Sequence, residues 1–189
     1  MISYSFIKRL VDIALAIVLI FLLSPTFLIL ALVIKVHDGG PAIFRQKRVG
    51  KNGIIFSFYK FRSMPVNTPN VESNETQKIH VTKIGKFIRR TNFDELPQFY
   101  NVLKGDMSFI GPRPPITTQT YLINLRKLNG SLNMRPGLTG WAQVNSYDGM
   151  SVFEKAKFDG EYASKNTFKF DLLILYKTIL YFTKKPPTY

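Results

Sequence analysis

A long apolar stretch near the N-terminus constrains this chain more than any other feature. Residues 10–34 read LVDIALAIVLIFLLSPTFLILALVI and carry one charged residue, Asp12. At ~1.5 Å per residue, a straight helix of this length would reach roughly 37 Å, enough to cross the ~30 Å hydrocarbon core of a bilayer. A cleaved signal peptide fits poorly, because the stretch is too long and no small-residue cleavage site follows Ile34. The sequence therefore predicts a segment embedded in a membrane.

Ser24-Pro25 interrupts this stretch near its middle. Proline lacks a backbone donor and clashes with the preceding turn, so we expect a kink, and the Ser24 hydroxyl can bond back to a freed carbonyl. Two arrangements fit the residues: a kinked spanning helix, which most long apolar segments form, and a re-entrant helix pair that enters and leaves through one face. In both, the positive-inside rule places the basic remainder of the chain in the cytoplasm.

The charge of the chain narrows its partners. Twenty-six Lys and Arg residues against 12 Asp and Glu give a net charge of +14, which favours nucleic acid, phospholipid headgroups or phosphorylated substrates. The absence of cysteine excludes a thiolate nucleophile, a disulfide framework and a zinc knuckle. The two histidines, His37 and His80, stand in no recognisable motif. Any catalysis therefore falls to carboxylates, lysines and arginines.

The remainder of the chain predicts an α+β fold that is mainly helical. Its 189 residues suffice for one compact core. Asn52-Gly53 between two alternating runs predicts a small β-hairpin, and residues 65–80 read as a polar loop. Helices are expected at about 82–90, 94–103, 116–128, 152–164 and 168–182. The last is too short and too charged to span a membrane, but its broad apolar surface suits a membrane interface.

Two adjacent carboxylates, Asp94 and Glu95, stand out in this basic chain. In a structural interpretation, Asn92 is a helix N-cap and Glu95 takes the capping-box position. In a catalytic interpretation, the helix N-terminus favours the ionised form of Asp94, and an ionised aspartate near Arg89 can bind Mg²⁺ or attack a phosphorus atom. The two side chains would point about 100° apart, so Glu95 would have a separate task, orienting a group or moving a proton.

Several basic residues are candidates to hold phosphate. Arg113 is the most informative, because Pro112 and Pro114 fix the backbone on both sides and a pre-oriented guanidinium suits bidentate phosphate contact. An ordinary exposed turn explains the same residues. Lys60 and Arg62 alternate with aromatic residues, a pattern that also fits a strand with one buried face. The other candidates are Arg89, Arg90 and Arg135.

Together these features resemble a known family. The run YKFRSM (59–64), the block GKFIRRTNFDELPQFYNVLKGDMSFIGPRP (85–114), RPGLTGWAQVN (135–145) and the pattern Asp159…Tyr162…Asp171 accompany the apolar segment with its Ser24-Pro25 break. The chain resembles the bacterial sugar transferases, in particular the small monotopic polyprenyl-phosphate phosphoglycosyl transferases. The resemblance covers nearly the whole chain, and the central block is its most specific part.

The resemblance implies a reaction. A sugar-1-phosphate would pass from a UDP-sugar to undecaprenyl phosphate with release of UMP, through a covalent phosphosugar on Asp94, as the first membrane step of a bacterial surface glycan or glycoconjugate. Asp94 would also bind Mg²⁺, and Glu95 would complete the catalytic pair. The candidate phosphate- and substrate-binding residues are Lys60, Arg62, Arg89, Gln98, Arg113 and Arg135.

The resemblance also implies an architecture. Ser24 and Pro25 would make residues 1–36 a re-entrant membrane hairpin, against the spanning alternative that the residues alone favour. Residues 37–189 would form a cytosolic, membrane-associated catalytic domain, with interfacial amphipathic helices around its active site. The location would be the cytoplasmic face of the bacterial inner membrane, with the bilayer as a partner, no nucleic acid, and a homodimer as one option for assembly.

The chain departs from the family at one loop. Many relatives continue after QVN with Gly-Arg, whereas here Ser146-Tyr147 follows Asn145. We therefore expect this loop to bind the nucleotide or sugar differently. The chain also begins directly at the apolar segment, without the extra N-terminal membrane helices of longer relatives.

Two other functional classes stay open. One is a basic, membrane-associated nucleic-acid binder that stacks RNA bases on aromatic side chains. The other is a non-catalytic scaffold, in which Asp94→Asn leaves function intact.

Overall fold

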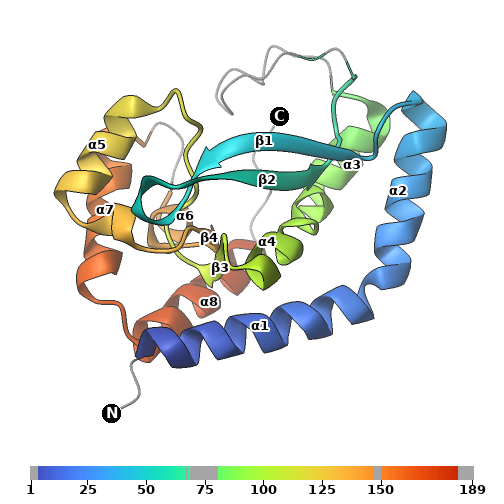
Figure 1. Ribbon diagram of the computed structural model, residues 1–189. Helices are drawn as coiled ribbons and strands as arrows, with labels where there is room; N and C mark the ends of the chain where they lie inside the picture. The colour runs from blue at the N-terminus through green and yellow to red at the C-terminus, as the bar shows by residue number, and fades with distance from the viewer. Residues whose placement is uncertain (1–3, 67, 69–80, 147–149, 183–189) are drawn as a thin grey trace.

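The computed structural model describes residues 4–66, 68, 81–146 and 150–182 (Figure 1). The described part is mainly helical with two small two-stranded sheets, which confirms the predicted helical α+β class. Its elements are α1 (Tyr4–Leu22), α2 (Ser24–Asp38), β1 (Ile43–Val49), β2 (Ile55–Phe61), α3 (Lys83–Arg90), α4 (Gln98–Lys104), β3 (Ser108–Ile110), α5 (Thr120–Leu128), β4 (Gly137–Thr139), α6 (Trp141–Val144), α7 (Val152–Ser164) and α8 (Phe168–Phe182), with short 3₁₀ turns at Lys51–Gly53, Phe93–Glu95 and Ser131–Asn133.

The β-hairpin is formed as the sequence predicts. Strands β1 and β2 pair antiparallel, with Ile43 opposite Phe61 and Val49 opposite Ile55. Asn52 and Gly53 make the turn at φ angles of 56° and 80°, a left-handed conformation that asparagine and glycine tolerate best. In Figure 1 the hairpin lies across the molecule above α4, and α1 runs along the opposite side.

The N-terminal apolar stretch forms two helices with the break at the predicted place. Helices α1 and α2 meet at a bend of 61°, with Pro25 in the first turn of α2. The Ser24 hydroxyl donates to the carbonyl of Phe21 at 2.8 Å, the back-bond expected beside a proline break. Among the described helices none is long and apolar enough to cross a membrane alone, whereas α1 and α2 together meet that requirement as a bent pair.

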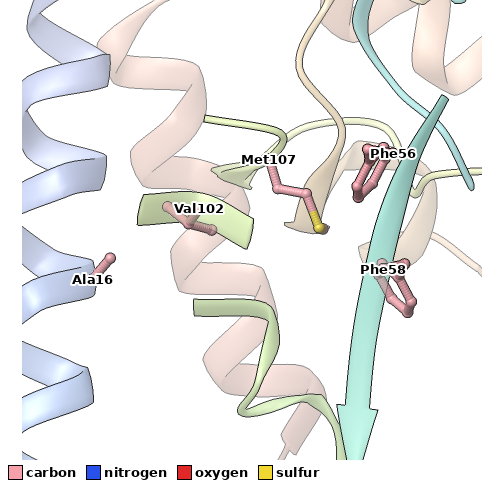
Figure 2. Close-up of a cluster of buried hydrophobic side chains, with 5 residues drawn as sticks. All are labelled: Ala16, Phe56, Phe58, Val102 and Met107. Atoms are coloured by element: carbon pink, nitrogen blue, oxygen red, sulfur yellow. The ribbon is translucent and has the colours of Figure 1, made fainter. Parts of the chain in front are cut away.

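Both N-terminal helices share hydrophobic clusters with the rest of the chain. Ala16 of α1 packs with Phe56 and Phe58 of β2, Val102 of α4 and Met107 (Figure 2). A second cluster joins α2 to β2 and α3, through Leu30, Ile34, Phe61 and Ile88. The two helices therefore pack against one body, although their outer faces expose large apolar side chains such as Phe21, Leu28 and Val36.

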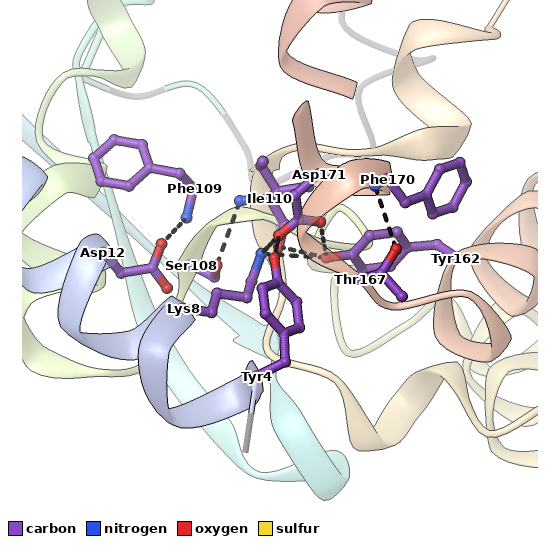
Figure 3. A network of polar contacts seen from close by, with 10 residues as sticks. All are labelled: Tyr4, Lys8, Asp12, Ser108, Phe109, Ile110, Tyr162, Thr167, Phe170 and Asp171. Carbon is purple, nitrogen blue, oxygen red and sulfur yellow. Dashed lines mark hydrogen bonds and ion pairs between the residues drawn. The ribbon is translucent and has the colours of Figure 1, made fainter. Parts of the chain in front are cut away.

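Buried polar contacts attach α1 to the C-terminal helices (Figure 3). Lys8 of α1 forms an ion pair with Asp171 of α8, whose other carboxylate oxygen accepts a hydrogen bond from the Tyr162 hydroxyl of α7 at 2.8 Å. Asp12 accepts from the backbone N–H of Phe109 at 3.1 Å, which explains the single charge in the apolar stretch. Burial, reinforced by Asp171, raises the pKa of Tyr162 well above its ordinary value, so this hydroxyl stays protonated as the donor.

Some elements differ from the sequence prediction. The parallel pair β3–β4 and the short helix α6 were not anticipated, because strands of three residues and a helix of four carry almost no periodicity. The helix expected at 116–128 begins at Thr120, because Ile116 forms a β-bridge with Arg48 and a turn follows before the helix. Most of the loop predicted at 65–80 lies outside the described residues.

Candidate active site

The carboxylate pair lies in a 3₁₀ turn between two helices, which corrects the predicted N-cap. Asn92 adopts a left-handed conformation with φ 56° and makes no side-chain cap, so the predicted capping box is wrong. Asparagine accepts this positive φ more readily than most residues. Helix α4 begins only at Gln98, after Pro97. The carboxylates therefore do not project from the first turn of a long helix.

Lys60 joins the two carboxylates. Its Nζ lies 3.1 Å from Asp94 Oδ2 and 2.9 Å from Glu95 Oε1. Because side chains alternate along a strand, Lys60 is on the same face of β2 as the buried Phe56 and Phe58, at the end nearest the carboxylates. The predicted strand is confirmed, but the prediction of one buried face is wrong, because Phe61 on the opposite face is buried against α2 and α3.

Arg113 approaches the same pair from the proline-rich turn. Its Nη2 donates to Glu95 Oε1 at 2.6 Å, so Glu95 has two cationic partners and Asp94 has Lys60. Arg113 is not a simple exposed turn residue, since its side chain is 38% exposed and ends in this ion pair. Charge-assisted contacts of this length are stronger than neutral hydrogen bonds and fix the geometry of the cluster.

The two carboxyls have pKa values shifted in opposite directions. Burial raises the pKa of Asp94 above its ordinary range; the charge of Lys60 opposes this rise, and the neighbouring Glu95 carboxylate adds to it. Burial also tends to raise the pKa of Glu95. The positive charges of Arg113 and Lys60 outweigh burial and hold this pKa well below its ordinary value. The prediction that a helix N-terminus favours ionised Asp94 is therefore wrong, because the dominant influence is desolvation.

The pair lies on the wall of a cavity of about 410 Å³. Five predicted site residues line it together: Lys60, Arg89, Asp94, Glu95 and Arg113. The wall of the cavity therefore carries charge of both signs. Uncharged residues make up much of the remaining wall, among them Leu122, Leu138, Thr139, Ala142, Gln143, Val144, Ser146 and Thr178.

The other predicted binding residues do not line this cavity. Arg62 is buried after the end of β2, and its backbone N–H donates to Ala42. Gln98 is fully buried at the start of α4, and its side-chain amide has no hydrogen-bond partner among the residues that the structure describes. Arg135 donates through Nε to the carbonyl of Gly105 at 3.2 Å. The exposed Arg90 also lies outside the lining, and Tyr147 falls outside the described residues.

Sequence reasoning missed several cavity residues. Arg48, Gln119, Arg126 and Lys155 come from separate elements that only the tertiary fold brings together. One weak signal existed for Arg126, an arginine on the apolar side of the weakly amphipathic α5. It is 2% exposed and bonds to Asp159 of α7 through two nitrogens, at 2.8 and 2.6 Å.

The carboxylate pair suits Mg²⁺ in donor chemistry. Within the described residues there is no cluster of three or more acidic or histidine side chains that would bind a metal by itself. Mg²⁺ commonly uses one or two carboxylates and completes its shell with substrate phosphates and water. Asp94 and Glu95 provide such hard oxygen ligands on the wall of the cavity.

Comparison with known proteins assigns the family. A family model described as bacterial sugar transferase matches residues 3–185, and the chain belongs to this family. It is 43% identical over 184 residues to the UDP-N-acetylgalactosamine-undecaprenyl-phosphate N-acetylgalactosaminephosphotransferase of Aeromonas hydrophila, covering 93% of this chain and 43% of that protein. It is 39% identical over 183 residues to the UDP-glucose:undecaprenyl-phosphate glucose-1-phosphate transferase of Escherichia coli, covering 92% and 39%.

The chain thus spans about two fifths of the length of these two relatives. It spans more of another relative, the uncharacterized sugar transferase EpsL of Bacillus subtilis, with 36% identity over 173 residues, 92% of this chain and 85% of the relative. The family model, which matches residues 3–185, covers α1, α2 and every residue that lines the cavity.

Proposed function

We propose that the protein transfers a sugar-1-phosphate from a UDP-sugar to undecaprenyl phosphate and releases UMP. The observation that carries this is the pairing of Asp94 with Glu95 on a cavity wall that also presents Lys60, Arg89 and Arg113. A diphosphate is attacked readily only when its oxygens are neutralised, and these cations are suited to that task. Two relatives carry names that describe sugar-phosphate transfer to undecaprenyl phosphate.

In the proposed first step, an Asp94 carboxylate oxygen attacks the sugar-proximal phosphorus. A bond forms between that oxygen and phosphorus, the bond from phosphorus to the bridging oxygen breaks, and UMP leaves with the electron pair. Asp94 must be ionised for this attack. Burial makes its carboxylate poorly solvated and so more nucleophilic once formed, while Lys60 keeps the ionised form accessible.

In the second step, a phosphate oxygen of undecaprenyl phosphate attacks the same phosphorus. The bond from phosphorus to Asp94 breaks, the carboxylate is restored, and the product carries a diphosphate between lipid and sugar. Glu95 stays ionised throughout because of its lowered pKa, so its proposed task is to orient Lys60 and Arg113 rather than to move a proton. Mg²⁺ held by Asp94 would supply further neutralisation of phosphate oxygens.

We place the protein on the cytoplasmic face of the bacterial inner membrane, with α1 and α2 as a re-entrant pair. The support is the 61° bend together with packing of both helices on one body, since a straight spanning helix would carry one arm away from it. Exposed apolar residues of α8, including Leu172, Tyr176 and Ile179, suit the membrane interface. A lipid phosphate at headgroup height would then meet the cavity.

UMP release tests the reaction. Detergent-solubilised protein is mixed with Mg²⁺, undecaprenyl phosphate and each of a panel of UDP-sugars. Asp94→Asn is the test variant, and Asp106→Asn is its matched control, because Asp106 pairs with Lys104 outside the cavity lining. Release from one donor, lost in Asp94→Asn and kept in Asp106→Asn, is expected. Release that survives Asp94→Asn would overturn the assignment of the nucleophile.

Thiol labelling in cells tests the topology, because the natural chain has no cysteine. Ser5→Cys reports the start of α1 and Lys86→Cys reports the catalytic body. A re-entrant pair predicts that a membrane-impermeant thiol reagent modifies neither until the cells are opened. Labelling of Ser5→Cys in intact cells would indicate a spanning segment instead.

A further inference from the structure

The proline-rich turn that carries Arg113 is held along its backbone. Residues 112, 114 and 115 are prolines without an N–H, yet each carbonyl from 112 to 115 accepts a hydrogen bond. Two donors are backbone N–H groups next to the sheets, from Gly137 to Pro112 at 3.0 Å and from Val49 to Pro115 at 2.9 Å. The other two donors are arginine side chains, Arg126 to Arg113 at 2.8 Å and Arg48 to Pro114 at 2.9 Å.

Arg126 is itself fixed by a buried carboxylate. Its Nε and Nη2 both donate to Asp159 Oδ2, and the side chains of the pair are 3% and 1% exposed. The third nitrogen, Nη1, donates to the Arg113 carbonyl. Arg126 therefore lines the cavity as one of its cations, yet all three nitrogens of its guanidinium contact protein oxygens.

We propose that Arg126, held by Asp159, is a positioning residue that fixes Arg113 in the orientation that meets Glu95. The contacts form a chain: Asp159 to Arg126, Arg126 to the carbonyl of Arg113, and the Arg113 guanidinium to Glu95 at 2.6 Å. The inference rests on the proposed function, in which Arg113 binds a substrate phosphate. Misplacing such a group by about 1 Å can cost roughly 10²-fold in rate.

Two other roles make different predictions. A purely structural pair would lower stability when broken and affect Arg113 no more than any other residue. An arginine that bound phosphate directly would act independently of Arg113, and the losses from the two substitutions would multiply.

A double-mutant cycle separates these roles. Arg126→Lys keeps the charge opposite Asp159, but a single ammonium cannot reproduce the fork that contacts both Asp159 and a carbonyl. Arg126→Lys, Arg113→Ala and the double variant are compared with wild type in kcat/KM for UMP release, normalised to the folded fraction. We expect Arg126→Lys to lower kcat/KM roughly 30-fold, and the double variant to lie within about threefold of Arg113→Ala. Losses that multiply would overturn the proposal.

Asp171→Asn is the structural control for this cycle. It breaks the buried ion pair with Lys8, which lies outside the cavity lining. It is expected to lower stability but to change kcat/KM per folded molecule by less than about threefold. A loss from Asp171→Asn alone as large as that from Arg126→Lys would mean that lost stability imitates lost positioning, and would overturn the proposal.

A crystal structure of Arg126→Lys gives a readout that does not depend on activity. We expect the 112–115 turn to shift and the contact between Arg113 Nη2 and Glu95 Oε1 to be lost. An unchanged contact would overturn the positioning role. If wild type releases no UMP from any donor, the proposed function fails, and this structure alone decides whether Arg126 positions Arg113.

Discussion

Two buried ionic clusters in this protein differ in what surrounds them. The cluster of Lys8, Tyr162 and Asp171 is enclosed between α1, α7 and α8. The cluster of Lys60, Asp94, Glu95 and Arg113 lies on the wall of a 410 Å³ cavity. Both place a carboxylate beside a lysine.

The difference teaches how to separate a structural ion pair from a reactive one. In the enclosed cluster each partner is satisfied within the protein, so it attaches the N-terminal helix to the body. In the cavity cluster one carboxyl has a raised pKa and its neighbour a lowered one, a division typical of groups with separate chemical tasks. The predictions below test this contrast.

The largest effect is expected from Asp94→Asn. If Asp94 is the nucleophile, turnover falls by about 10³-fold or more, because an amide does not form the covalent intermediate. The melting temperature at neutral pH should stay equal or rise, since the substitution removes a buried charge. Steady-state UMP release and thermal unfolding measure the two quantities. A large drop in melting temperature would show that Asp94 is structural.

Asp171→Asn should have the opposite profile. Breaking the buried ion pair with Lys8 is expected to lower the free energy of unfolding by about 3 kcal/mol. Turnover per folded molecule should change by less than about threefold. Denaturant unfolding in detergent, beside activity on the same sample, measures both. An active-site role would instead appear as lost turnover at unchanged stability.

The pH dependence of kcat/KM should report Asp94. Its raised pKa predicts that activity falls on acidification at a pH above the ordinary value of about 3.9 for aspartate. Because the Glu95 carboxylate contributes to that rise, Glu95→Gln should move the acid limb to lower pH while lowering the maximum. A limb that moves to higher pH would contradict the electrostatic account.

Asp94 and Glu95 should make the free energy of unfolding change with pH in opposite directions. A raised folded pKa means that Asp94 contributes stability at low pH that is lost as pH rises through that pKa. Glu95 contributes stability above its ordinary pKa of about 4.3, lost only as pH falls toward its much lower folded value. Between the ordinary pKa of aspartate and the raised folded pKa of Asp94, melting temperature should therefore fall less with rising pH in Asp94→Asn than in wild type. An identical slope would refute the assigned shift.

The smallest effect is expected at the helix break. Ser24→Ala removes the hydrogen bond to the Phe21 carbonyl and should lower the free energy of unfolding by about 1 kcal/mol or less. Pro25→Ala restores a helical donor and should weaken the bend more than Ser24→Ala does. The thiol-labelling pattern of Ser5→Cys in each background measures whether the hairpin is kept.

Local signals in the sequence predicted much of the fold. Asn52-Gly53 specified the hairpin and Ser24-Pro25 the break, because turn and proline chemistry act over a few residues. Lys60, Asp94 and Glu95 were identified as candidates, but their convergence was not, since Lys60 is 34 residues from Asp94. The raised pKa of Asp94 could not be predicted from the sequence either, because it depends on burial that only tertiary packing creates.

Arg126 and Asp159 are a further example of contacts that the sequence could not predict. Their contact joins residues 33 apart on α5 and α7, and only the tertiary fold brings Arg126 to the Arg113 carbonyl. The predicted capping box failed because Asn92 adopts a left-handed conformation without a side-chain cap, and only a 3₁₀ turn follows it. Short-range patterns describe elements well, and sites assembled from several elements poorly.

The central claim is tested most directly by intact and peptide mass spectrometry without the lipid acceptor. Protein incubated with Mg²⁺ and the active UDP-sugar should gain the mass of one sugar phosphate on the peptide that contains Asp94, with about one UMP released per molecule. The adduct should disappear on addition of undecaprenyl phosphate. Full turnover through direct transfer, with UMP released only when the lipid is present and no adduct on Asp94, would contradict the account.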